Sequence, residues 1–348
     1  MTTALITGGA GFIGSNLVHH LLEARPDWNL LVVDKLTYAG NLRNLEGVLE
    51  SPRLTFAQSD IGDREAMGEL FREHRPDLVV NLAAESHVDR SILDASPFIV
   101  TNVLGTQVLL ESAREYGVQR FLQVSTDEVY GSASSGERFD EAAPLRPTSP
   151  YAASKAAGDL LCDAYRRTYG LPIIVTRSSN NYGPYQFPEK LLPLAILVLL
   201  RGEEVPVYGE GANMRDWLYV TDNCRGLLSV LEKGKVGEVY NIGTGQEHPN
   251  LEVIELLWDL FANRMSRPND EGAPVKFVDD RPGHDLRYAM SMEKVNRDTG
   301  WSPSVGLQAG LRTTLDWYLD HRDWAEEVLS GDYLHYYEAV YERSWGRK

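Results

Sequence analysis

The sequence predicts an α/β fold, a Rossmann-like doubly wound parallel sheet with a smaller, mainly C-terminal α/β substrate-binding domain. Two observations predict it. Short apolar segments alternate with amphipathic helical segments through the first half of the chain, a pattern typical of parallel β–α–β units. The first of these apolar segments also runs directly into a glycine-rich turn and a helix.

The N-terminal segment contains that glycine-rich turn. A short buried strand, Leu5–Thr7, is followed by three spaced glycines and then by a helix over residues 15–23. Gly8 permits a tight turn, Gly11 lets the backbone approach a pyrophosphate, and Gly14 allows the helix to pack closely on the strand. The helix N-terminus then faces the phosphates of a bound dinucleotide.

The second predicted strand, Leu30–Val33, ends in Asp34, twenty residues beyond Gly14. A carboxylate at this position accepts hydrogen bonds from the adenosine ribose hydroxyls and repels a 2′-phosphate. We therefore predict NAD rather than NADP as the cofactor, from the combination of the first strand, the glycines, the helix, the second strand and its terminal acid.

Four more strands are predicted along the first half of the chain, and polar segments directly follow three of them. The carboxyl ends of parallel strands meet at one edge of a sheet, where ligands bind, so these segments should line one crevice. The predicted strands cover residues 54–58, 78–82, 121–125 and 173–176, and the polar segments are Asp60-Ile61, Ala83-Ala84-Glu85-Ser86 and Thr126-Asp127-Glu128.

After Arg177 the pattern changes to a proline-rich stretch and a glycine-rich segment at 208–216. We predict short strands at 217–220 and 239–242 with a helix at 223–232 between them, returning to the first domain. The NAD-binding domain is therefore predicted over 1–177 and 217–245, and the nucleotide-sugar-binding domain over 178–216 and 246–348. The apolar run 191–200 is predicted to be a buried helix, residues 251–265 an amphipathic helix, and residues 132–149 a surface loop.

Composition limits the class of protein. The net charge of −16 over 348 residues argues against nucleic acid or an anionic membrane as a partner, but a few local cations can still hold a diphosphate. The two cysteines, Cys162 and Cys224, have no ligand-type spacing, which predicts a reduced cytoplasmic protein without a metal site. No segment is apolar for the ~20 residues that a bilayer requires.

The aromatic residues of the C-terminal stretch are expected to pack rather than to bind a cofactor: Trp317, Tyr318, Trp324, Tyr333, Tyr336, Tyr337 and Tyr341.

Two groups of residues carry potential acid–base chemistry. Tyr151 and Lys155 are four residues apart and share one helix face, where the ammonium could favour the tyrosinate. Such a pair alone is also compatible with an ordinary amphipathic helix.

Asp127 and Glu128 can serve one ligand only if the strand ends or turns there, because alternate residues of a strand point to opposite faces. Carboxylates this close should couple and raise the pKa of one of them, and the sequence does not say which.

Five motifs together resemble the nucleotide-sugar 4,6-dehydratases, a group of extended short-chain dehydrogenases, and most closely those that act on dTDP-glucose. The resemblance extends from Thr7 to about Tyr288. The Thr-Asp-Glu triplet separates this group from epimerases that share the Tyr and Lys. The motifs are Thr-Gly-Gly-Ala-Gly-Phe-Ile-Gly at 7–14, Asp-Lys-Leu-Thr-Tyr-Ala-Gly at 34–40, Leu-Ala-Ala-Glu-Ser-His-Val-Asp-Arg-Ser-Ile at 82–92, Ser-Thr-Asp-Glu-Val-Tyr-Gly at 125–131, and Asn-Asn-Tyr-Gly-Pro-Tyr-Gln-Phe-Pro-Glu-Lys at 180–190.

The resemblance implies a reaction in which C4 of the sugar is oxidised, water is eliminated across C5 and C6, and the hydride returns to C6. Tyr151 would take the C4 hydroxyl proton, with Thr126 holding the same oxygen and Lys155 supporting Tyr151. Glu128 would be the base at C5 and Asp127 the acid at C6. The implied product is a 4-keto-6-deoxy sugar nucleotide, with NAD retained through the cycle.

The resemblance also implies two sets of binding residues. For the cofactor they are Gly8, Gly11, Phe12, Ile13, Gly14, Asp34, Lys35, Thr37, Asp60, Ile61, Ala83, Ala84, Thr101, Tyr151, Lys155 and Asn181. For the substrate they are Ser86, Thr126, Asn180, Lys190, Leu191, Arg215, Asn250, Arg281 and His284. Three have alternatives: Arg215 could pair with a surface carboxylate, His284 could cap a turn, and Asn250 follows Pro249 where a threonine is expected. His87, Asp89 and Arg90 could form a network that supports Ser86.

Rival functions remain at this stage. A nucleotide-sugar 4-epimerase or a dehydratase of UDP-glucose could use the same scaffold, and a non-catalytic NAD-sensing module would need only the cofactor site. Asp127-Glu128 argues against the epimerase, and intact Thr126, Tyr151 and Lys155 argue against loss of catalysis. The resemblance implies a homodimer through the helix at 102–116 and the Tyr151 helix. Each helix offers apolar positions that could equally face the sheet: Leu104, Val108, Leu109, Ala113, Ala157, Leu160, Leu161 and Ala164.

Overall fold

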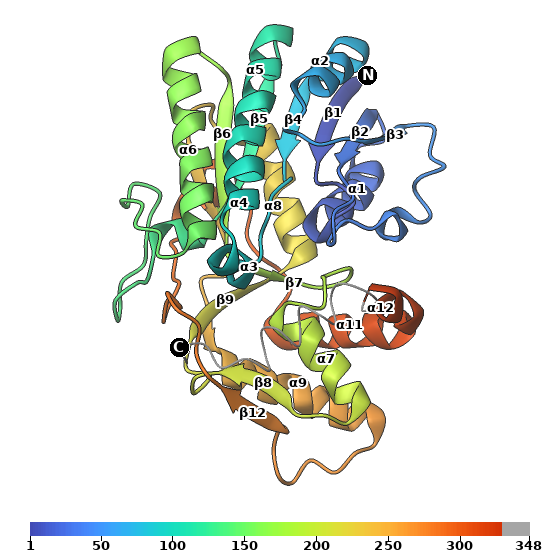
Figure 1. Ribbon diagram of the computed structural model, residues 1–348, viewed down its shortest axis with the longest axis vertical. Helices are drawn as coiled ribbons and strands as arrows, with labels where there is room; N and C mark the ends of the chain where they lie inside the picture. The colour runs from blue at the N-terminus through green and yellow to red at the C-terminus, as the bar shows by residue number, and fades with distance from the viewer. Residues whose placement is uncertain (329–348) are drawn as a thin grey trace.

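A computed structural model describes residues 1–328, which form a large parallel sheet with helices on both faces and a smaller α/β region below it (Figure 1). The predicted fold class is confirmed. The seven-stranded sheet has the order β10-β6-β5-β4-β1-β2-β3, and every neighbouring pair is parallel. Its strands are β1 (Thr2–Thr7), β2 (Trp28–Asp34), β3 (Leu54–Gln58), β4 (Leu78–Asn81), β5 (Arg120–Thr126), β6 (Ile173–Ser178) and β10 (Val239–Ile242).

Alternate residues of these strands supply two separate cores. Ile6 and Val32 point to the face covered by α1 (Phe12–Ala24) and α8 (Val220–Lys233). Leu5 and Leu31 point to the opposite face, covered by α2 (Arg64–His74), α5 (Thr106–Tyr116) and α6 (Pro150–Tyr169). Because both faces are covered, the strands are apolar on both sides, as parallel strands usually are. The strand order reverses between β1 and β4, which opens a crevice at the carboxyl ends of the strands.

Three short segments connect β4 to the helices of the second face. They are α3 (Val88–Leu93), α4 (Ser96–Ile99) and the π-helical turn η2 (Val100–Gly105), which runs into α5. The 3₁₀ turns are η1 (Leu42–Leu45) and η3 (Asp127–Tyr130). Residues 132–149 contain no helix and no strand longer than a single bridge, so the predicted loop is confirmed.

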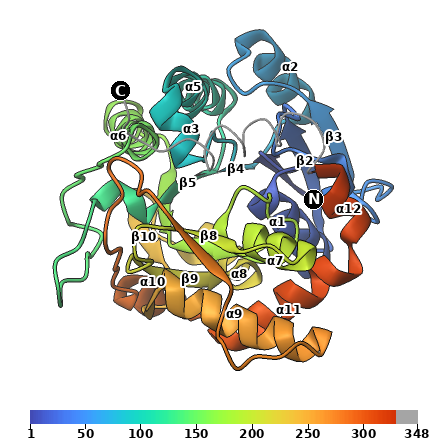
Figure 2. The ribbon, with the colours of Figure 1, turned by 60° about the horizontal axis from the view of Figure 1, so that its bottom comes forward.

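The smaller region has its own core. Its sheets are β11-β9-β7, made of β7 (Asn180–Tyr182), β9 (Met214–Tyr219) and β11 (Glu247–Pro249), and the pair β8 (Val205–Tyr208) and β12 (Val275–Val278). Its helices are α7 (Leu191–Arg201), α9 (Asn250–Met265), α11 (Leu307–Asp320) and α12 (Arg322–Val328). In Figure 2, α7, α9 and α11 lie beside β8 and β9, and α12 lies farther away, towards β2. The helix α10 (Glu293–Thr299) packs on α8 and β10.

The helices expected at 191–200 and 251–265 are α7 and α9. Pro193 is tolerated in α7 because it lies in the first turn, where the backbone N–H has no partner within the helix. The strand expected at 217–220 is placed differently. It forms the end of β9 in the three-stranded sheet, and Val220 already begins α8, so only β10 of the two predicted strands joins the large sheet. The predicted domain boundaries themselves remain a prediction.

Trp317, Tyr318 and Trp324 pack against one another, as expected for core aromatics. Tyr333, Tyr336, Tyr337 and Tyr341 lie outside the described residues. Within residues 1–328, no helix is long and apolar enough to cross a bilayer, and no cluster of His, Cys, Asp and Glu side chains in that range could hold a metal ion.

Candidate active site

The crevice at the carboxyl ends of the strands gathers most of the residues that were predicted to bind the cofactor. Fifteen of the sixteen line it, and Ser86 and Lys190 from the predicted substrate set line it too. The exception is Asn181 in β7, whose amide donates to the Ser179 carbonyl at 2.9 Å. Convergence of strand ends explains this gathering, because Gly8, Asp34, Asp60, Ala83 and Ser125 all follow or end a strand of one sheet.

The glycine turn has no room for side chains. Gly8 has φ +68°, a conformation that glycine adopts without strain. A Cβ added to Gly14 would lie 2.0 Å from the Gly8 carbonyl oxygen, so α1 can approach β1 only with glycine there. Gly11 caps the start of α1 without a side chain, which leaves the first N–H groups of the helix open to an anion.

Asp34 lies at the end of β2 and is 8 % exposed. Its carboxylate accepts hydrogen bonds from the backbone N–H groups of Ala10, at 2.9 Å, and Leu36, at 2.8 Å, and each oxygen has a further lone pair for a hydroxyl. Next to it, Lys35 forms an ion pair with Asp60 at 2.6 Å. An open helix N-terminus, a side-chain-free cradle and an acceptor for ribose hydroxyls together fit NAD.

Tyr151 and Lys155 lie on α6, which begins where Ser149 accepts a hydrogen bond from the Ala152 N–H. The Tyr151 N–H donates to the Ser91 hydroxyl at 3.2 Å, so α3 fixes the first turn of α6. The Lys155 ammonium donates to the Val124 carbonyl at 2.7 Å. Burial lowers the pKa of Lys155 to about 8, with Asp159 as its main opposite charge.

The expected electrostatic effect of Lys155 on Tyr151 is not among the main influences on that phenol. Burial raises the pKa of Tyr151 well above its usual 10, Glu128 raises it further, and the Thr126 hydroxyl lowers it. The reason is that Lys155 points to the Val124 carbonyl and balances Asp159, whereas Tyr151 faces the carboxylates. Ionisation of Tyr151 at neutral pH therefore requires a further positive charge close to its hydroxyl.

The strand turns at the carboxylate pair, as its chemistry requires. β5 ends at Thr126, and η3 begins at Asp127. The Thr126 hydroxyl accepts from the Glu128 N–H at 3.3 Å and donates to Asp127 Oδ1 at 3.2 Å. The turn brings both carboxylates near Tyr151, since each of them raises its pKa.

The two carboxylates have different surroundings. Burial, Glu128 and Asp216 raise the pKa of Asp127 far above its usual value. Asp127 Oδ2 has no hydrogen-bond partner within residues 1–328. Burial also raises the pKa of Glu128, but Arg281, Arg215 and Lys190 oppose that rise. The surroundings therefore favour a protonated Asp127 beside an ionised Glu128, the division of roles that an acid and a base require.

Side chains from the smaller region approach the pair from the other side. Arg215 on β9 is 4 % exposed, and its guanidinium donates to the carbonyls of Asp285 and Leu286 and lies over the Tyr288 ring. The alternative of a surface ion pair for Arg215 is therefore wrong. The buried Oδ1 atoms of Asn180 and Asn250 lack hydrogen-bond partners in the described part of the chain. Lys190 donates to the Ser86 carbonyl at 3.0 Å and precedes Leu191, the first residue of α7.

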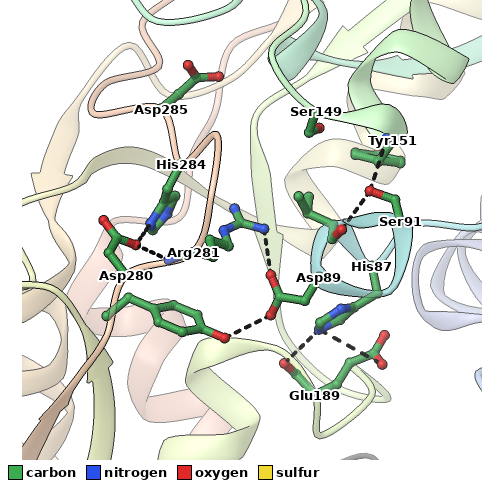
Figure 3. A network of polar contacts seen from close by, with 12 residues as sticks. His87, Asp89, Ser91, Ser149, Tyr151, Glu189, Asp280, Arg281, His284 and Asp285 are labelled. Atoms are coloured by element: carbon green, nitrogen blue, oxygen red, sulfur yellow. Dashed lines mark hydrogen bonds and ion pairs between the residues drawn. The ribbon is translucent and has the colours of Figure 1, made fainter. Parts of the chain in front are cut away.

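Arg281 and His284 belong to a network that links the two regions (Figure 3). The Arg281 guanidinium donates to Asp89 at 2.9 Å, and the Tyr208 hydroxyl donates to the other oxygen of Asp89 at 2.9 Å. Arg281 Nε is buried and has no partner among residues 1–328. His284 contacts Asp280 at 2.6 Å within the turn, and burial together with Arg281 lowers its pKa to about 4, so His284 is neutral.

Sequence reasoning missed several groups in this site. The Tyr288 hydroxyl donates to Asp285 at 3.0 Å and lies 3.5 Å from Glu128 Oε2. Asp216 is buried beside Asp127 and accepts hydrogen bonds from Thr244 and Gly245. The proximity of Asp216 to Arg215 in the sequence was the only signal for Asp216, because its contacts to Thr244 and Gly245 span 28 and 29 residues and the Tyr288 contact to Glu128 spans 160.

Comparison with known proteins agrees with this geometry. Residues 5–314 match the family model described as GDP-mannose 4,6 dehydratase. The chain belongs to this family. It is 48% identical to a dTDP-glucose 4,6-dehydratase of Shigella flexneri, over 97% of this chain and 98% of the relative. The solved dTDP-glucose 4,6-dehydratase of Streptomyces venezuelae with NAD bound has a TM-score of 0.88 and 48% identity, covering 94% of this chain and 100% of that one.

A member of a different reaction class has the same fold. The UDP-glucose 4-epimerase of Thermotoga maritima superimposes with a TM-score of 0.82 and 33% identity, covering 92% of this chain and 99% of that one. The fold alone therefore does not decide between elimination and epimerisation.

Proposed function

We propose that this chain is an NAD-dependent hydro-lyase that converts dTDP-glucose to dTDP-4-keto-6-deoxyglucose and water. The observation that carries the proposal is the turn at 126–128, which places two carboxylates with different surroundings in one buried site with Tyr151, beside a crevice that fits NAD. Relatives near half identity over almost the full chain carry this activity in their names, which supports the choice of sugar nucleotide.

The residues divide the proton transfers between them. Tyr151 takes the proton of the C4 hydroxyl, and Thr126 hydrogen-bonds the same oxygen as it becomes a ketone. The ketone acidifies the hydrogen at C5, which Glu128 removes while Asp127 protonates the departing C6 hydroxyl to give water. Bound NAD would supply the hydride acceptor for C4 and the hydride donor for C6, and its positively charged ring would favour the tyrosinate. Glu128 then returns its proton to C5, and the proton that Tyr151 took from the C4 hydroxyl replaces, by exchange with solvent, the one that Asp127 gave to water, so atoms and charges balance.

The smaller region holds the nucleotide diphosphate. Arg215 and Arg281 supply buried positive charge close to Glu128, and Lys190 adds a third cation at the start of α7. Their charge neutralises the diphosphate locally in an otherwise acidic protein. The unpartnered oxygens of Asn180 and Asn250 can accept hydrogen bonds from hydroxyl or N–H groups of the ligand.

Two other reactions remain as alternatives. UDP-glucose differs from dTDP-glucose in the base and the ribose, groups that the catalytic triplet does not contact. A 4-epimerase needs Tyr151 and Lys155 but no acid for C6, so Asp127 and Glu128 would have no purpose in it. The carboxylate turn therefore favours elimination over epimerisation.

To test this proposal, the purified protein is incubated with dTDP-glucose and with UDP-glucose separately. The alkali-induced absorbance of the 4-keto-6-deoxy product reports turnover. We expect turnover of the dTDP sugar, reduced about 10²-fold or more in Glu128→Gln, the range typical for removal of a general base. Glu115→Gln, an exposed change on α5, is the matched control. Formation of dTDP-galactose without the keto sugar would show epimerisation instead.

A homodimer through α5 and α6 in the cytoplasm is part of the proposal. Leu104 is 54% and Leu160 is 63% exposed on this face, which supports an interface. Val108, Leu109 and Ala113 were counted as possible interface positions, but they are buried against the sheet. Light scattering would report the dimer, and Leu160→Lys should convert it to a monomer.

A further inference from the structure

Two segments meet across the crevice that fits NAD. Residues 37–40 follow β2, and all but Tyr38 line the crevice from the first region. Residues 186–190 precede α7, and all but Pro188 line it from the smaller region. Tyr38 lies in the first segment and Glu189 in the second. The Tyr38 hydroxyl donates to Glu189 Oε1 at 3.2 Å, so a hydrogen bond joins the two walls directly.

The Tyr38 ring is held on two further sides. The guanidinium of Arg90 lies over the ring, 3.9 Å from its centre. Phe187 packs edge-on against it with the ring centres 5.4 Å apart. A cation over an aromatic face and an edge-to-face aromatic pair are both attractive contacts. The ring therefore contributes to joining the walls independently of the hydroxyl.

Glu189 is the centre of these contacts. Its side chain is 1% exposed, so its carboxylate depends on partners within the protein. Arg90 Nε donates to Oε2 at 3.2 Å, and His87 Nε2 lies 4.0 Å from the same oxygen. Figure 3 shows the His87 ring directed toward Glu189.

The partners of Glu189 are themselves fixed. Arg90 belongs to α3, the short helix that also carries Ser91, the hydrogen-bond partner of the Tyr151 N–H. The contact between Tyr38 and Glu189 is therefore anchored to the same element that positions the start of α6. Opening it would expose the buried Glu189 carboxylate and separate the Tyr38 ring from Phe187.

We propose that Tyr38, Arg90 and Glu189 form a clasp that retains NAD, so that the cofactor leaves only when Tyr38 separates from Glu189. These are positioning residues, because they hold together the walls of the crevice rather than react. The benefit of retention rests on the proposed function, since a reaction that ends with oxidised NAD never needs to release it. Loss of reduced cofactor would leave an oxidised sugar without its hydride.

The test measures NAD retention without any sugar nucleotide. Purified protein loaded with NAD is mixed with a large excess of 1,N⁶-etheno-NAD, and exchange is followed by fluorescence and by assay of released NAD. Tyr38→Ala removes the ring and the hydroxyl, and we expect exchange to be about tenfold faster or more, the size typical for loss of a hydrogen bond to a charged group. Tyr38→Phe keeps the ring, and we expect a smaller acceleration.

Tyr169→Phe is the matched control, because that tyrosine also lies under an arginine, Arg114 at 4.8 Å, but belongs to the last turn of α6 and not to either wall segment. Activity of Tyr38→Ala should fall on dilution and return to within about twofold of wild type when free NAD is added, because the reacting groups are intact. Wild-type exchange rates in both Tyr38 variants would overturn the clasp. If Tyr38→Ala does not fold, the same criterion applies to Tyr38→Phe and Glu189→Gln. Retained NAD with no dehydration would count against the proposed function alone.

Discussion

The two sides of the crevice differ in the partners of their polar groups. The NAD side is the glycine turn with Asp34. The sugar side consists of Asn180, Lys190, Arg215, Asn250 and Arg281. On the NAD side, backbone N–H groups and a carboxylate already satisfied by Ala10 and Leu36 surround an open helix end. On the sugar side, three buried polar atoms lack partners among the described residues: Asn180 Oδ1, Asn250 Oδ1 and Arg281 Nε. Buried groups usually have partners, so the unpartnered atoms of the sugar side are suited to a ligand, whereas the NAD side offers a ligand the open N–H groups of α1 and the remaining lone pairs of Asp34.

Tyr151 stands where the two sides meet, and changing it should give the largest effect. Tyr151→Phe removes the phenol that accepts the C4 proton and leaves both binding sides in place. We expect kcat to fall by about 10³-fold, within the range for a lost general base, with bound NAD and the Kd for dTDP unchanged. Steady-state kinetics, NAD assay after gel filtration and calorimetry would measure this. A variant with near-wild-type kcat would assign proton removal to another group.

Gly14→Ala breaks the NAD side alone. The new Cβ would lie 2.0 Å from the Gly8 carbonyl oxygen, so α1 must move away from the turn that meets the phosphates. Overpacking of this kind costs about 1–3 kcal/mol, which corresponds to roughly 5- to 150-fold in NAD affinity. Gly68→Ala in α2, where a Cβ meets nothing within 4 Å, is the control. Equal losses of NAD and dTDP binding would mean that the two sides are not independent.

Asp89→Asn tests the sugar side. The amide oxygen of this variant could still accept from the Tyr208 hydroxyl, but the side chain would no longer neutralise Arg281, whose position then depends on fewer contacts. We expect about a tenfold rise in KM for the sugar nucleotide, the cost of one weakened charge-assisted bond, with kcat and NAD content nearly unchanged. Asp94→Asn, an exposed change just after α3, serves as the control. A fall in kcat at constant KM would contradict a role in binding.

The contrast between the sides also explains what could be predicted from the sequence. The glycine turn, Asp34 and the residues after β3, β4 and β5 are local signals at strand ends, and one sheet brings them together. Arg215, Asn250 and Arg281 come from separate segments, and only the family resemblance pointed to them. Tyr288, Asp216 and the Asp89 contacts span long stretches of chain, so no local pattern encoded them. The placement of residues 217–219 was missed because a strand's sequence does not specify which sheet it joins.

The smallest effect should come from the charge of Asp127. Its pKa is raised far above the usual 3.8 by burial, Glu128 and Asp216, so the folded chain keeps a proton that the unfolded chain releases. Its contribution to stability is therefore full below the usual pKa and is lost as pH rises through the raised folded pKa. Asp127→Asn has no such loss, because an amide does not ionise.

The difference in Tm between Asp127→Asn and wild type should therefore grow in favour of the variant as pH rises. Between roughly pH 5 and pH 8 we expect the corresponding difference in the free energy of unfolding to grow, by at most about 1.4 kcal/mol for each pH unit below the folded pKa. Glu128→Gln should show a smaller dependence, because Arg281, Arg215 and Lys190 already favour its charged form. Thermal unfolding across this range, with NAD saturating, measures both variants. A constant difference would mean that Asp127 is ionised at neutral pH, and the proton for the C6 hydroxyl would then have to come from another group.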